Sequence, residues 1–351
     1  MTPEGPPLDL RLLGGFSFRC RPDCGLCCFT TPSVSPVEAS RLLQIDPSAP
    51  VRAGDRGSSF VESRPNGGAC HVLRGVRCRV HPARPTPCRE FPVTVHLGER
   101  AQATAVLSCP GLAPGPWGRW AEEGGAGPGP IGLDEEIDAA REGLSAVPWV
   151  RWSEEGRRRW RSVRRRLARA GGWMEPEDLR DRLRPRLLEI ARSGFPAEPP
   201  PDRSEGLEVL PLFYDPALGC LAITDHPGGV ELLVLREDGG DPVPAGAWAV
   251  PDRSPDCDAD ADRTLRGYLD YLLARDFTYW AAAARAGDDD RLIDLVEEDL
   301  GRFGALVLAR AWVRRAMTHP TRGRLDASAI LDGIRATDAE FLDRPTLGRI
   351  L

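Results

Sequence analysis

Apolar side chains recur at helical spacing along the second half of the chain. Two stripes follow the i, i+3, i+4, i+7 pattern that places side chains on one face of an α-helix. They consist of Leu265, Tyr268, Leu269 and Leu272, and of Val296, Leu300, Phe303 and Val307. Both stripes predict helices whose apolar face packs into a core. Further helices are predicted over residues 133–144, 153–170 and 177–192.

Short apolar runs bounded by turn residues predict strands. The predicted strands cover residues 93–97, 101–107, 207–214, 220–224 and 230–236. A hairpin is expected where two further runs flank Arg74-Gly75. Ser35-Pro36-Val37-Glu38 has the residues of a capping box with proline at the first helical position, so a short helix is expected to continue to about Gln44.

These elements predict an α+β protein, with an irregular cysteine-rich N-terminal module of short strands and then a mainly helical region with a small β element. The composition shifts to Gly, Pro and Trp after residue 110, and Pro199-Pro200-Pro201 marks a second boundary. We expect a cysteine module at 1–112, a Gly/Pro-rich linker with a basic helical segment at 113–200, and a mainly helical domain at 201–351.

The composition excludes several classes of function. The chain has 351 residues and 46 basic side chains, all arginine, because the sequence contains no lysine. Schiff-base chemistry, pyridoxal-phosphate attachment and a Walker-A phosphate loop each need a lysine of the protein, so all three are excluded. The formal net charge of −6 argues against general nucleic-acid binding.

The chain shows no sign of a membrane segment or a targeting segment. Its first residues carry an acid and prolines, and no uncharged apolar stretch approaches the ~20 residues that span a bilayer. We therefore expect a cytoplasmic protein without membrane contact. In that compartment thiols stay reduced, so clustered cysteines indicate metal binding rather than disulfides.

An acidic run between the strands and the helices superficially resembles a calcium loop. Asp256, Asp258, Asp260 and Asp262 alternate as in an EF-hand, but Ala261 stands where that loop needs glycine and Gly267 where it needs glutamate. We interpret the run as an acidic helix start, which the helix dipole favours.

The strongest chemical signal is a cluster of cysteines. Eight of the ten cysteines fall between Cys20 and Cys109. Cys24 and Cys27 form a Cys-x2-Cys turn, in which two thiolates converge on one ion or cluster edge, and Cys20 adds a third arm suited to an iron–sulfur cluster. Cys28 is adjacent to Cys27, and neighbouring side chains generally diverge. We therefore expect Cys28 to serve a second centre or to lie just outside the coordination shell.

The second half of the constellation comprises Cys70, Cys78, Cys88 and Cys109. Eight thiolates would fill two four-ligand sites, or one cluster with a ring of redox or catalytic thiols. Arginines stand beside them, where guanidinium groups offset the negative charge of a thiolate cluster: Arg19, Arg21, Arg77, Arg79, Arg84 and Arg89. Cys220 and Cys257 lack such partners and are expected to be structural. His71, His81 and His96 lie in the same window and are candidate ligands, although ordinary hydrogen-bonding roles are favoured over ligation.

This pattern resembles the YkgJ-type cysteine-cluster family, a zinc- or iron-chelating domain, over about residues 16–110. The matching positions are Cys20, Cys24, Cys27, Cys28, Cys70, Cys78, Arg84-Pro85, Cys88-Arg89, Phe91-Pro92 and Cys109. The chain departs from the common pattern at His81, where tyrosine often stands. Some members are flagellin lysine N-methylases, which carry an iron–sulfur cluster and use S-adenosylmethionine, and whose cysteine module precedes a largely helical region.

The resemblance implies metal ligation by the eight cysteines and leaves the function open between several classes. One reading is an iron–sulfur protein that methylates lysine on a protein such as flagellin. Because the sequence has no Rossmann-type glycine-rich turn, the S-adenosylmethionine would bind at the cluster, with Cys20, Cys24 and Cys27 as iron ligands and Arg84 or Arg89 meeting its carboxylate. The alternatives are a non-enzymatic zinc- or iron-chelating module and an electron-transfer protein. Iron–sulfur is favoured over zinc because adjacent cysteines and three-arm spacing suit a cluster better than paired tetrahedral sites.

Overall fold

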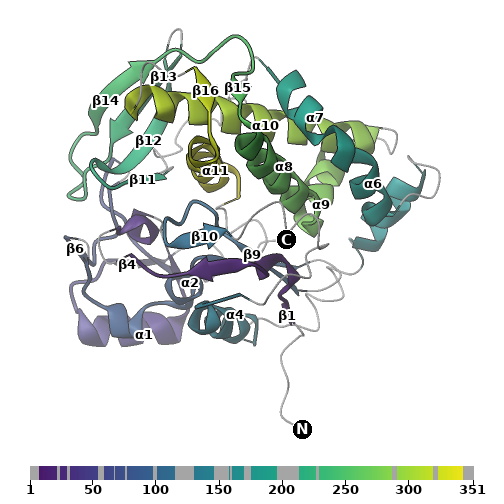
Figure 1. Ribbon diagram of the computed structural model, residues 1–351. Coiled ribbons are helices and arrows are strands. Elements are labelled where there is room, and N and C mark those ends of the chain that lie inside the picture. The colour runs from purple at the N-terminus through teal and green to yellow at the C-terminus, as the bar shows by residue number, and fades with distance from the viewer. Residues whose placement is uncertain are drawn as a thin grey trace.

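The computed structural model places the N-terminal third of the chain beneath a helical half and a separate antiparallel sheet (Figure 1). The residues that it describes are 8–21, 24–29, 32–53, 59–66, 68–75, 77–97, 101–114, 130–145, 158, 160–169, 175–195, 213–226, 229–286, 291–318 and 323–342. None of the helices in these ranges is long and apolar enough to cross a bilayer. The arrangement is mixed α and β, which confirms the predicted fold class.

The first structural unit is a small irregular lobe, which we call the cysteine lobe and define as residues 20–91. Its elements are the 3-10 helix η2 (Leu26–Phe29), strand β3 (Ser33–Val34), helix α1 (Pro36–Ile45), strands β4 (Val51–Ala53), β5 (Ser59–Val61), β6 (Leu73–Arg74) and β7 (Arg77–Cys78), the 3-10 helix η4 (His81–Ala83) and helix α2 (Thr86–Glu90). Strands β3, β5 and β4 form one antiparallel sheet, and β6 and β7 form the predicted hairpin. The capping box before α1 is also confirmed, because the Ser35 backbone N–H donates to Glu38 at 2.8 Å.

A second N-terminal unit joins the cysteine lobe to the helices. It comprises strand β1 (Leu8–Asp9), the 3-10 helix η1 (Arg11–Leu13), strands β2 (Phe16–Phe18), β8 (Val93–Leu97), β9 (Ala101–Ala105) and β10 (Leu112–Pro114), and helix α4 (Asp134–Ser145). Strands β8 and β9 are the two strands predicted after residue 92, and β1 joins them in parallel to β9. The inner side chains of this unit belong to the same apolar core as the helices.

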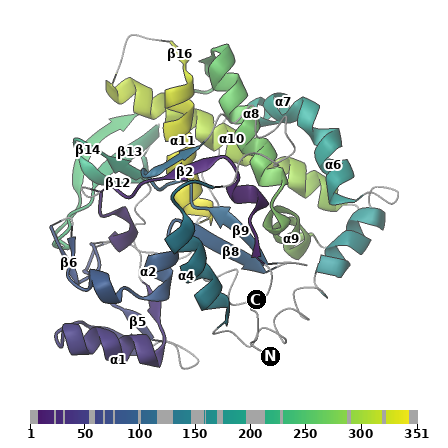
Figure 2. The same cartoon turned by 60° about the horizontal axis from the view of Figure 1, so that its bottom comes forward.

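The helical half packs around that core (Figure 2). It contains α6 (Pro176–Leu183), the 3-10 turn η5 (Arg184–Arg186), α7 (Leu187–Ser193), α8 (Ala259–Leu273), α9 (Asp276–Arg285), α10 (Arg291–Thr318) and α11 (Ala327–Leu342), with a parallel pair β15 (Asp256–Cys257) and β16 (Arg324–Leu325). Both predicted apolar stripes face inward: Leu265, Tyr268 and Leu269 are completely buried. Asp258 caps α8 by accepting from two backbone N–H groups, which confirms the acidic helix start.

Two of the other predicted helices differ from expectation in detail. The helix predicted over 177–192 is divided by η5, because Pro185 cannot donate the backbone hydrogen bond that would continue α6. Residues 160–169 of the predicted basic helix are helical, whereas most of its first turn lies outside the described residues. Its arginines are engaged in part within the protein: Arg166 donates to the carbonyls of Ala283 and Ala286.

The antiparallel sheet β11 (Phe213–Asp215), β12 (Gly219–His226), β13 (Gly229–Val234) and β14 (Val243–Trp248) lies between the helices and the cysteine lobe. Alternate residues of a strand point to opposite faces. Accordingly Leu221 and Ile223 pack with Val313 of α10, whereas Cys220 and Ala222 pack with Leu26 of the cysteine lobe. Both faces of β12 are therefore occupied. Strand β14 was not predicted, and the start of the predicted strand 207–214 lies outside the described residues.

A buried polar junction fastens β9 to the helices. The Arg275 guanidinium lies 4.3 Å from the centre of the Tyr271 ring and donates to the carbonyl of Ala105 at 3.2 Å. Asp338 accepts a hydrogen bond of 2.6 Å from the backbone N–H of Leu107, and its other oxygen lies 3.9 Å from Arg275. Burial raises the pKa of Asp338 to about 6, although the nearby Arg275 acts to lower it.

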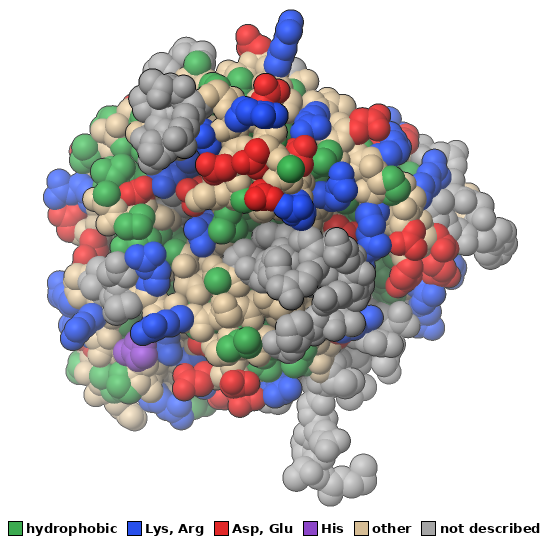
Figure 3. All heavy atoms as spheres, viewed as in Figure 1, with side chains coloured by type: hydrophobic (Ala, Val, Ile, Leu, Met, Phe, Trp, Pro, Cys, Tyr) green, Lys and Arg blue, Asp and Glu red, His purple; other side chains and the backbone are tan. Residues whose placement is uncertain are grey.

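Charge is dispersed over the outside of the molecule. On the face seen in Figure 3, basic and acidic side chains lie interspersed instead of gathering by sign. The described residues include exposed ion pairs, such as Arg52 with Glu62 and Arg89 with Glu142. Exposed pairs of this kind contribute little to stability, about 0–1 kcal/mol each.

Candidate metal centre

Six of the eight predicted metal-ligating cysteines surround one cavity in the cysteine lobe. The cavity has a volume of about 420 Å³. Its thiols come from Cys20, Cys27, Cys28, Cys70, Cys78 and Cys88. These residues lie on four separate segments, so the cavity is assembled by tertiary structure and not by a single motif.

The turn that carries the first cysteines is shaped by Gly25. Gly25 has a φ of +63°, a left-handed conformation in which a side chain would be strained. Its carbonyl accepts from the Cys28 backbone N–H at 2.9 Å, while the Cys24 sulfur accepts from the Leu26 backbone N–H at 3.3 Å. The turn thus brings Cys27 and Cys28 to the cavity and directs a backbone donor at the Cys24 sulfur.

Cys27 and Cys28 both line this cavity, so the expected divergence of the two neighbouring side chains is not observed. They are consecutive residues of η2, and the cavity is wide enough to be flanked by both. A hydrogen bond with Cys27, together with burial, raises the pKa of the Cys28 thiol. The proposed assignment of Cys28 to a separate centre therefore has no support from this geometry.

Cys70 and Cys78 are placed by the β6–β7 hairpin and the segment before it. The Cys70 backbone N–H donates to the Cys28 carbonyl at 2.6 Å, which joins this segment directly to the first cysteine turn. Cys78 lies opposite Leu73 in the hairpin register. The two halves of the sequence constellation are therefore hydrogen-bonded to each other at the cavity.

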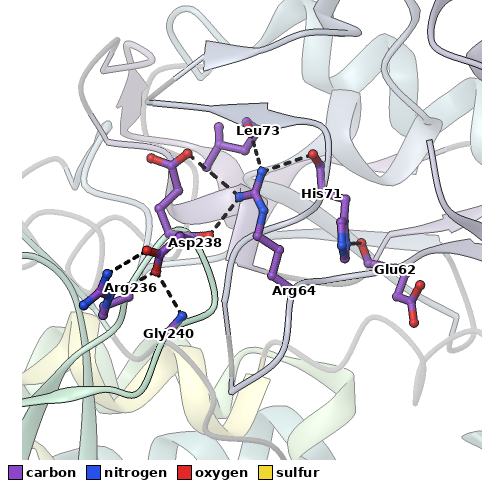
Figure 4. Close-up of polar contacts among 8 residues, drawn as sticks. Glu62, Arg64, His71, Leu73, Arg236, Asp238 and Gly240 are labelled. Atoms are coloured by element: carbon purple, nitrogen blue, oxygen red, sulfur yellow. Dashed lines mark hydrogen bonds and ion pairs between the residues drawn. The ribbon is translucent and has the colours of Figure 1, made fainter. Parts of the chain in front are cut away.

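Arg64 holds the segment between these cysteines against the antiparallel sheet (Figure 4). Its guanidinium donates to the carbonyls of His71 at 3.1 Å and Leu73 at 2.7 Å, and to the Glu237 carbonyl in the β13–β14 loop at 2.8 Å. The two loops touch closely, because a Cβ placed at Gly68 would come 2.7 Å from the Gly239 Cα. We call this contact the Arg64 clamp.

Cys88 is positioned by α2, whose start is tied to the start of α1. Glu38 accepts hydrogen bonds of 2.6 Å from both the backbone N–H and the hydroxyl of Thr86. Although burial opposes it, these bonds and those from Ser35 lower the pKa of Glu38. Glu38 is therefore a charged link that fixes the helix bearing Cys88 relative to the capping box.

Cationic groups line the cavity beside the thiols. They are Arg21, Arg77 and Arg84, and no aspartate or glutamate stands among its described lining residues. The Nε atom of Arg84 is buried and has no hydrogen-bond partner among the described residues. A buried donor without a partner costs free energy, so Arg84 has the capacity to bind an anion at this position.

Two other arginines beside the cysteines have partners away from the cavity. Arg89 donates to Glu142 of α4 at 2.7 Å and to Thr86 at 3.3 Å, and it is not among the cavity-lining residues. Arg79 pairs with Asp46 at 2.7 Å. The geometry therefore separates Arg84 from Arg89, which sequence reasoning treated as equivalent.

Burial governs the protonation of the thiols. It raises the pKa of Cys24 to about 12 and also raises the pKa values of Cys20, Cys70, Cys78 and Cys88. Arg84 acts in the opposite direction on Cys20, Cys78 and Cys88. At neutral pH these groups are thiols until a cation displaces their protons, so metal binding here releases protons.

Two predicted ligands lie outside the cavity lining. Cys24 and Cys109 are not among the lining residues. Cys24 packs instead with Cys220 of β12, and the Cys220 thiol lies 4.0 Å from the Cys24 carbonyl oxygen. Sequence reasoning assigned Cys220 a structural role, because no local spacing connects it with the cluster. Cys257 lies with β15, and its surroundings are Arg192, Asp258 and Asp262 rather than other cysteines.

The three histidines of this region have different surroundings. His71 Nδ1 lies 3.1 Å from the Glu62 carbonyl, as a hydrogen-bonding role predicts. His96 is buried, and burial lowers its pKa to about 3. His81 lines the cavity, and burial together with Arg84 lowers its pKa. Of the three, His81 is the one at the cavity.

The thiols surround a space without converging on one point. As the side chains stand, no three Cys, His, Asp or Glu groups within the described ranges are close enough to share a single metal ion. A single zinc ion needs Zn–S distances of ~2.3 Å to each of its thiolates. Ligation of an ion would therefore require the thiol side chains to move closer together.

Comparison with known families supports metal binding by the cysteine lobe. Residues 19–110 match the family model CxxCxxCC, which is described as a "Putative zinc- or iron-chelating domain". No match was found among curated proteins or solved structures. The matched segment contains all eight clustered cysteines and Arg84, and it ends well before Cys220. The sequence resemblance to the cysteine-cluster family is thus confirmed for this segment, and it supports metal binding.

Proposed function

We propose, from the premise that residues 19–110 form a zinc- or iron-chelating domain, that the cavity holds an iron–sulfur cluster at which S-adenosylmethionine binds. The observation that carries this proposal is the coexistence of six thiols and an unpartnered buried guanidinium Nε around one cavity of about 420 Å³. Thiols suit the cluster, and a guanidinium suits a carboxylate. The protein would then be a methyltransferase that acts on lysine of another protein, such as flagellin.

The first support is the match between the cavity and a cluster of several atoms. Six thiols exceed the four ligands of one tetrahedral zinc ion. Residues such as Leu42, Val61 and Val72 supply an apolar wall, which limits the access of water to reduced thiols. The cationic residues of the lining offset the negative charge that a thiolate-bound cluster carries.

The second support concerns what this chain's own residues would do for the cofactor. S-adenosylmethionine, when bound, supplies an electrophilic methyl group on a sulfonium. Arg84 would bind its carboxylate through charge-assisted hydrogen bonds and so orient it in the cavity. Arg21 and Arg77 would disfavour a protonated lysine ammonium nearby, which lowers the pKa of the incoming amine and favours its neutral, nucleophilic form.

A direct test uses protein purified without oxygen. The proposal expects a brown protein with broad visible absorption and iron by metal analysis, and binding of S-adenosylmethionine by calorimetry. Cys88→Ser should reduce iron content, and Arg84→Ala should weaken cofactor binding by at least about tenfold, which corresponds to ~1.4 kcal/mol. Arg89→Ala is the matched control, since Arg89 pairs with Glu142 outside the cavity, and it should leave binding unchanged.

Methyl transfer can be assayed against a protein substrate with labelled S-adenosylmethionine. Because the sequence contains no lysine, label on lysine must come from the substrate, so automethylation of lysine adds no background. A brown protein with full iron content that does not bind S-adenosylmethionine would contradict the enzymatic part of the proposal. A colourless protein containing zinc would contradict the cluster.

A second candidate is a non-enzymatic zinc- or iron-chelating module. The Arg64 clamp favours it, because it fastens the cysteine lobe to the antiparallel sheet as expected of a structural domain. This candidate predicts that Arg84→Ala alters neither metal content nor any ligand binding, and that metal removal affects stability alone. Calorimetry on the Arg84 variant therefore separates the two functions.

A further inference from the structure

Two exposed arginines of the β6–β7 hairpin stand at the opening of the cavity, and we call Arg74 and Arg77 the arginine pair. Arg77 lines the cavity and is also exposed, so it lies where the cavity meets solvent. Arg74 is exposed as well and lies directly opposite Arg77 in the hairpin register. Behind the pair, Arg21 and Arg84 line the interior. The opening is therefore positively charged from its rim inward.

The arginine pair is an unfavourable arrangement for the hairpin by itself. Side chains directly opposite each other in an antiparallel pair share one face of the sheet, and like charges in that position are destabilising. Neither Arg74 nor Arg77 forms an ion pair with any of the described residues, whereas Arg79, on the same hairpin, pairs with Asp46 at 2.7 Å. An anion bound between the two guanidinium groups would offset their repulsion.

The acids nearest to the opening do not neutralise it. Hydrogen bonds within its own turn lower the pKa of Asp46, and the charges of Arg79 and Arg74 add to that effect, but the ion pair of Asp46 is with Arg79. Burial raises the pKa of Glu136 in α4, although Arg84 acts to lower it, and the Arg84 Nε has no acceptor among the described residues. The opening thus keeps an excess of positive charge in a chain whose formal net charge is −6.

The cavity behind the arginine pair suits a peptide side chain better than a nucleotide base. Its wall contains the apolar residues Leu42, Val61 and Val72, against which the methylene groups of a lysine can pack. None of the described lining residues is aromatic, so the cavity offers no ring on which a base could stack. The chemistry of the lining therefore favours a protein as the partner that carries the negative charge.

A lysine substrate and this opening have charges of the same sign. The lysine ammonium is positive at neutral pH, so the guanidinium groups repel it unless its neighbours in the sequence are negative. Aspartate or glutamate beside the lysine would form charge-assisted hydrogen bonds with the exposed arginine pair. Such complementarity speeds association and discriminates against other partners. Arg21 and Arg84 would keep the interior positive while the acids stay outside.

We propose that the arginine pair binds an acidic segment of the protein substrate, so that the lysine brought to the cavity is one flanked by aspartate or glutamate. The inference rests on the proposed function for the identity of the target residue, and it adds the class of sequence that surrounds that residue. Arg74 and Arg77 bind the acidic side chains, and the lysine enters the cavity beside them.

The test measures binding of short synthetic peptides to the full-length protein purified without oxygen. Three labelled peptides share one central lysine and differ only in the residues on either side of it, which are aspartate, asparagine or arginine. Fluorescence anisotropy should show that the aspartate peptide binds at least about tenfold more tightly than the asparagine peptide, and that the arginine peptide binds least. The difference should shrink in about 0.5 M salt, because salt screens exposed charges. Equal affinity for the aspartate and asparagine peptides would overturn the inference.

Charge-reversal variants place the effect on the arginine pair. Arg74→Glu and Arg77→Glu should each weaken binding of the aspartate peptide by about tenfold. Arg41→Glu is the matched control, because Arg41 is exposed on α1 of the same lobe, forms no ion pair with the described residues and does not line the cavity. It should change the affinity by less than about twofold. Equal effects of Arg77→Glu and Arg41→Glu would overturn the inference, since net charge alone would then explain binding. If a variant does not fold, the three peptides on the wild type decide.

Separate assays distinguish failure of this inference from failure of the proposed function. Peptide binding is measured without S-adenosylmethionine, and methyl transfer to the same peptides is measured with it. Preference for the aspartate peptide without any methyl transfer supports the docking surface and contradicts the enzyme. Methyl transfer to all three peptides with equal kcat/KM does the reverse. A single-stranded oligonucleotide that binds more tightly than the aspartate peptide would assign the arginine pair to nucleic acid and would also overturn the inference.

Discussion

The cysteine lobe and the helical half bury their chains by different means. The apolar cluster within the lobe has seven buried members, and these are mostly valines with a single leucine, Leu42. The helical half instead joins apolar side chains from the six helices α6 to α11 into one continuous core. Small cores seldom offset the entropy of ordering a chain without a metal or another support. We therefore expect the lobe to depend on bound metal and on the Arg64 clamp, and the helical half to depend on side-chain packing.

Metal removal should produce the largest difference between the two regions. Stripping the reduced protein with a chelator should destabilise the lobe by several kcal/mol, since a ligand at a hundred times its Kd contributes about 2.7 kcal/mol. Hydrogen exchange should then show residues 59–90 losing protection while α8 and α10 keep theirs. Identical protection with and without chelator would show that the lobe does not depend on metal.

Shortening a buried leucine tests the same contrast from the other side. Leu269 of α8 and Leu42 of α1 are both completely buried. Each change to alanine should cost about 2–5 kcal/mol locally, measured by chemical denaturation. We expect Leu42→Ala to lower metal content because Leu42 lines the cavity, and Leu269→Ala to leave it unchanged. The opposite pattern of metal contents would break the comparison.

The polar junction between β9 and the helices predicts a pH dependence. The pKa of Asp338 is about 6 in the folded protein and 3.8 as its ordinary value. The folded chain therefore holds a proton that the unfolded chain releases between these values, so this contribution is fully present below pH ~4 and is lost as the pH rises through 6. About two pKa units correspond to ~3 kcal/mol.

Asp338→Asn isolates this contribution. From pH 4 to pH 7 the wild type should lose unfolding free energy relative to Asp338→Asn. Above pH 7 the difference between the two proteins should stay constant. Urea denaturation at several pH values measures it. A difference that stays constant across this range would mean that Asp338 does not titrate there.

The Arg64 clamp should show a smaller effect. Arg64→Ala removes a donor from three carbonyls and should cost about 1–3 kcal/mol, with loss of exchange protection near Cys70 and Cys78. Arg52→Ala is the control, because the Arg52–Glu62 pair is exposed and is expected to contribute about 0–1 kcal/mol. Equal effects of the two changes would show that the clamp adds nothing beyond an ordinary surface pair.

The sequence predicted local features of the fold well where the signal is local. The capping box at Ser35, the β6–β7 hairpin, the pair β8–β9 and the two buried helical stripes are all present. Strand β14 was missed because Pro244 and Gly246 weaken its strand pattern, and its pairing with β13 is irregular at Leu232 and Leu233. Strand β14 is stabilised by its pairing with β13, and the linear pattern of residues does not contain that contact.

The candidate site was predictable only in part, because some of its contacts are local in sequence and others are not. Clustering of cysteines identified the region, and six of the eight lie around one cavity. The sequence did not distinguish Arg84, which precedes α2 and lines the cavity, from Arg89, which lies within α2 and pairs with Glu142 of α4. Nor did it connect Cys220 with Cys24, because that contact depends on how a distant sheet docks. The contact between Cys24 and Cys220 therefore required the tertiary structure.

The distance along the chain between Cys24 and Cys220 also sets an order of events on the ribosome. A ribosome that adds 5–20 residues per second needs about 10–40 s to travel the 196 residues between them. During that interval the first cysteines have left the exit tunnel while β12 has not been made. The nascent lobe therefore spends its first seconds without the sheet that packs against Cys24 and Leu26 in the finished protein.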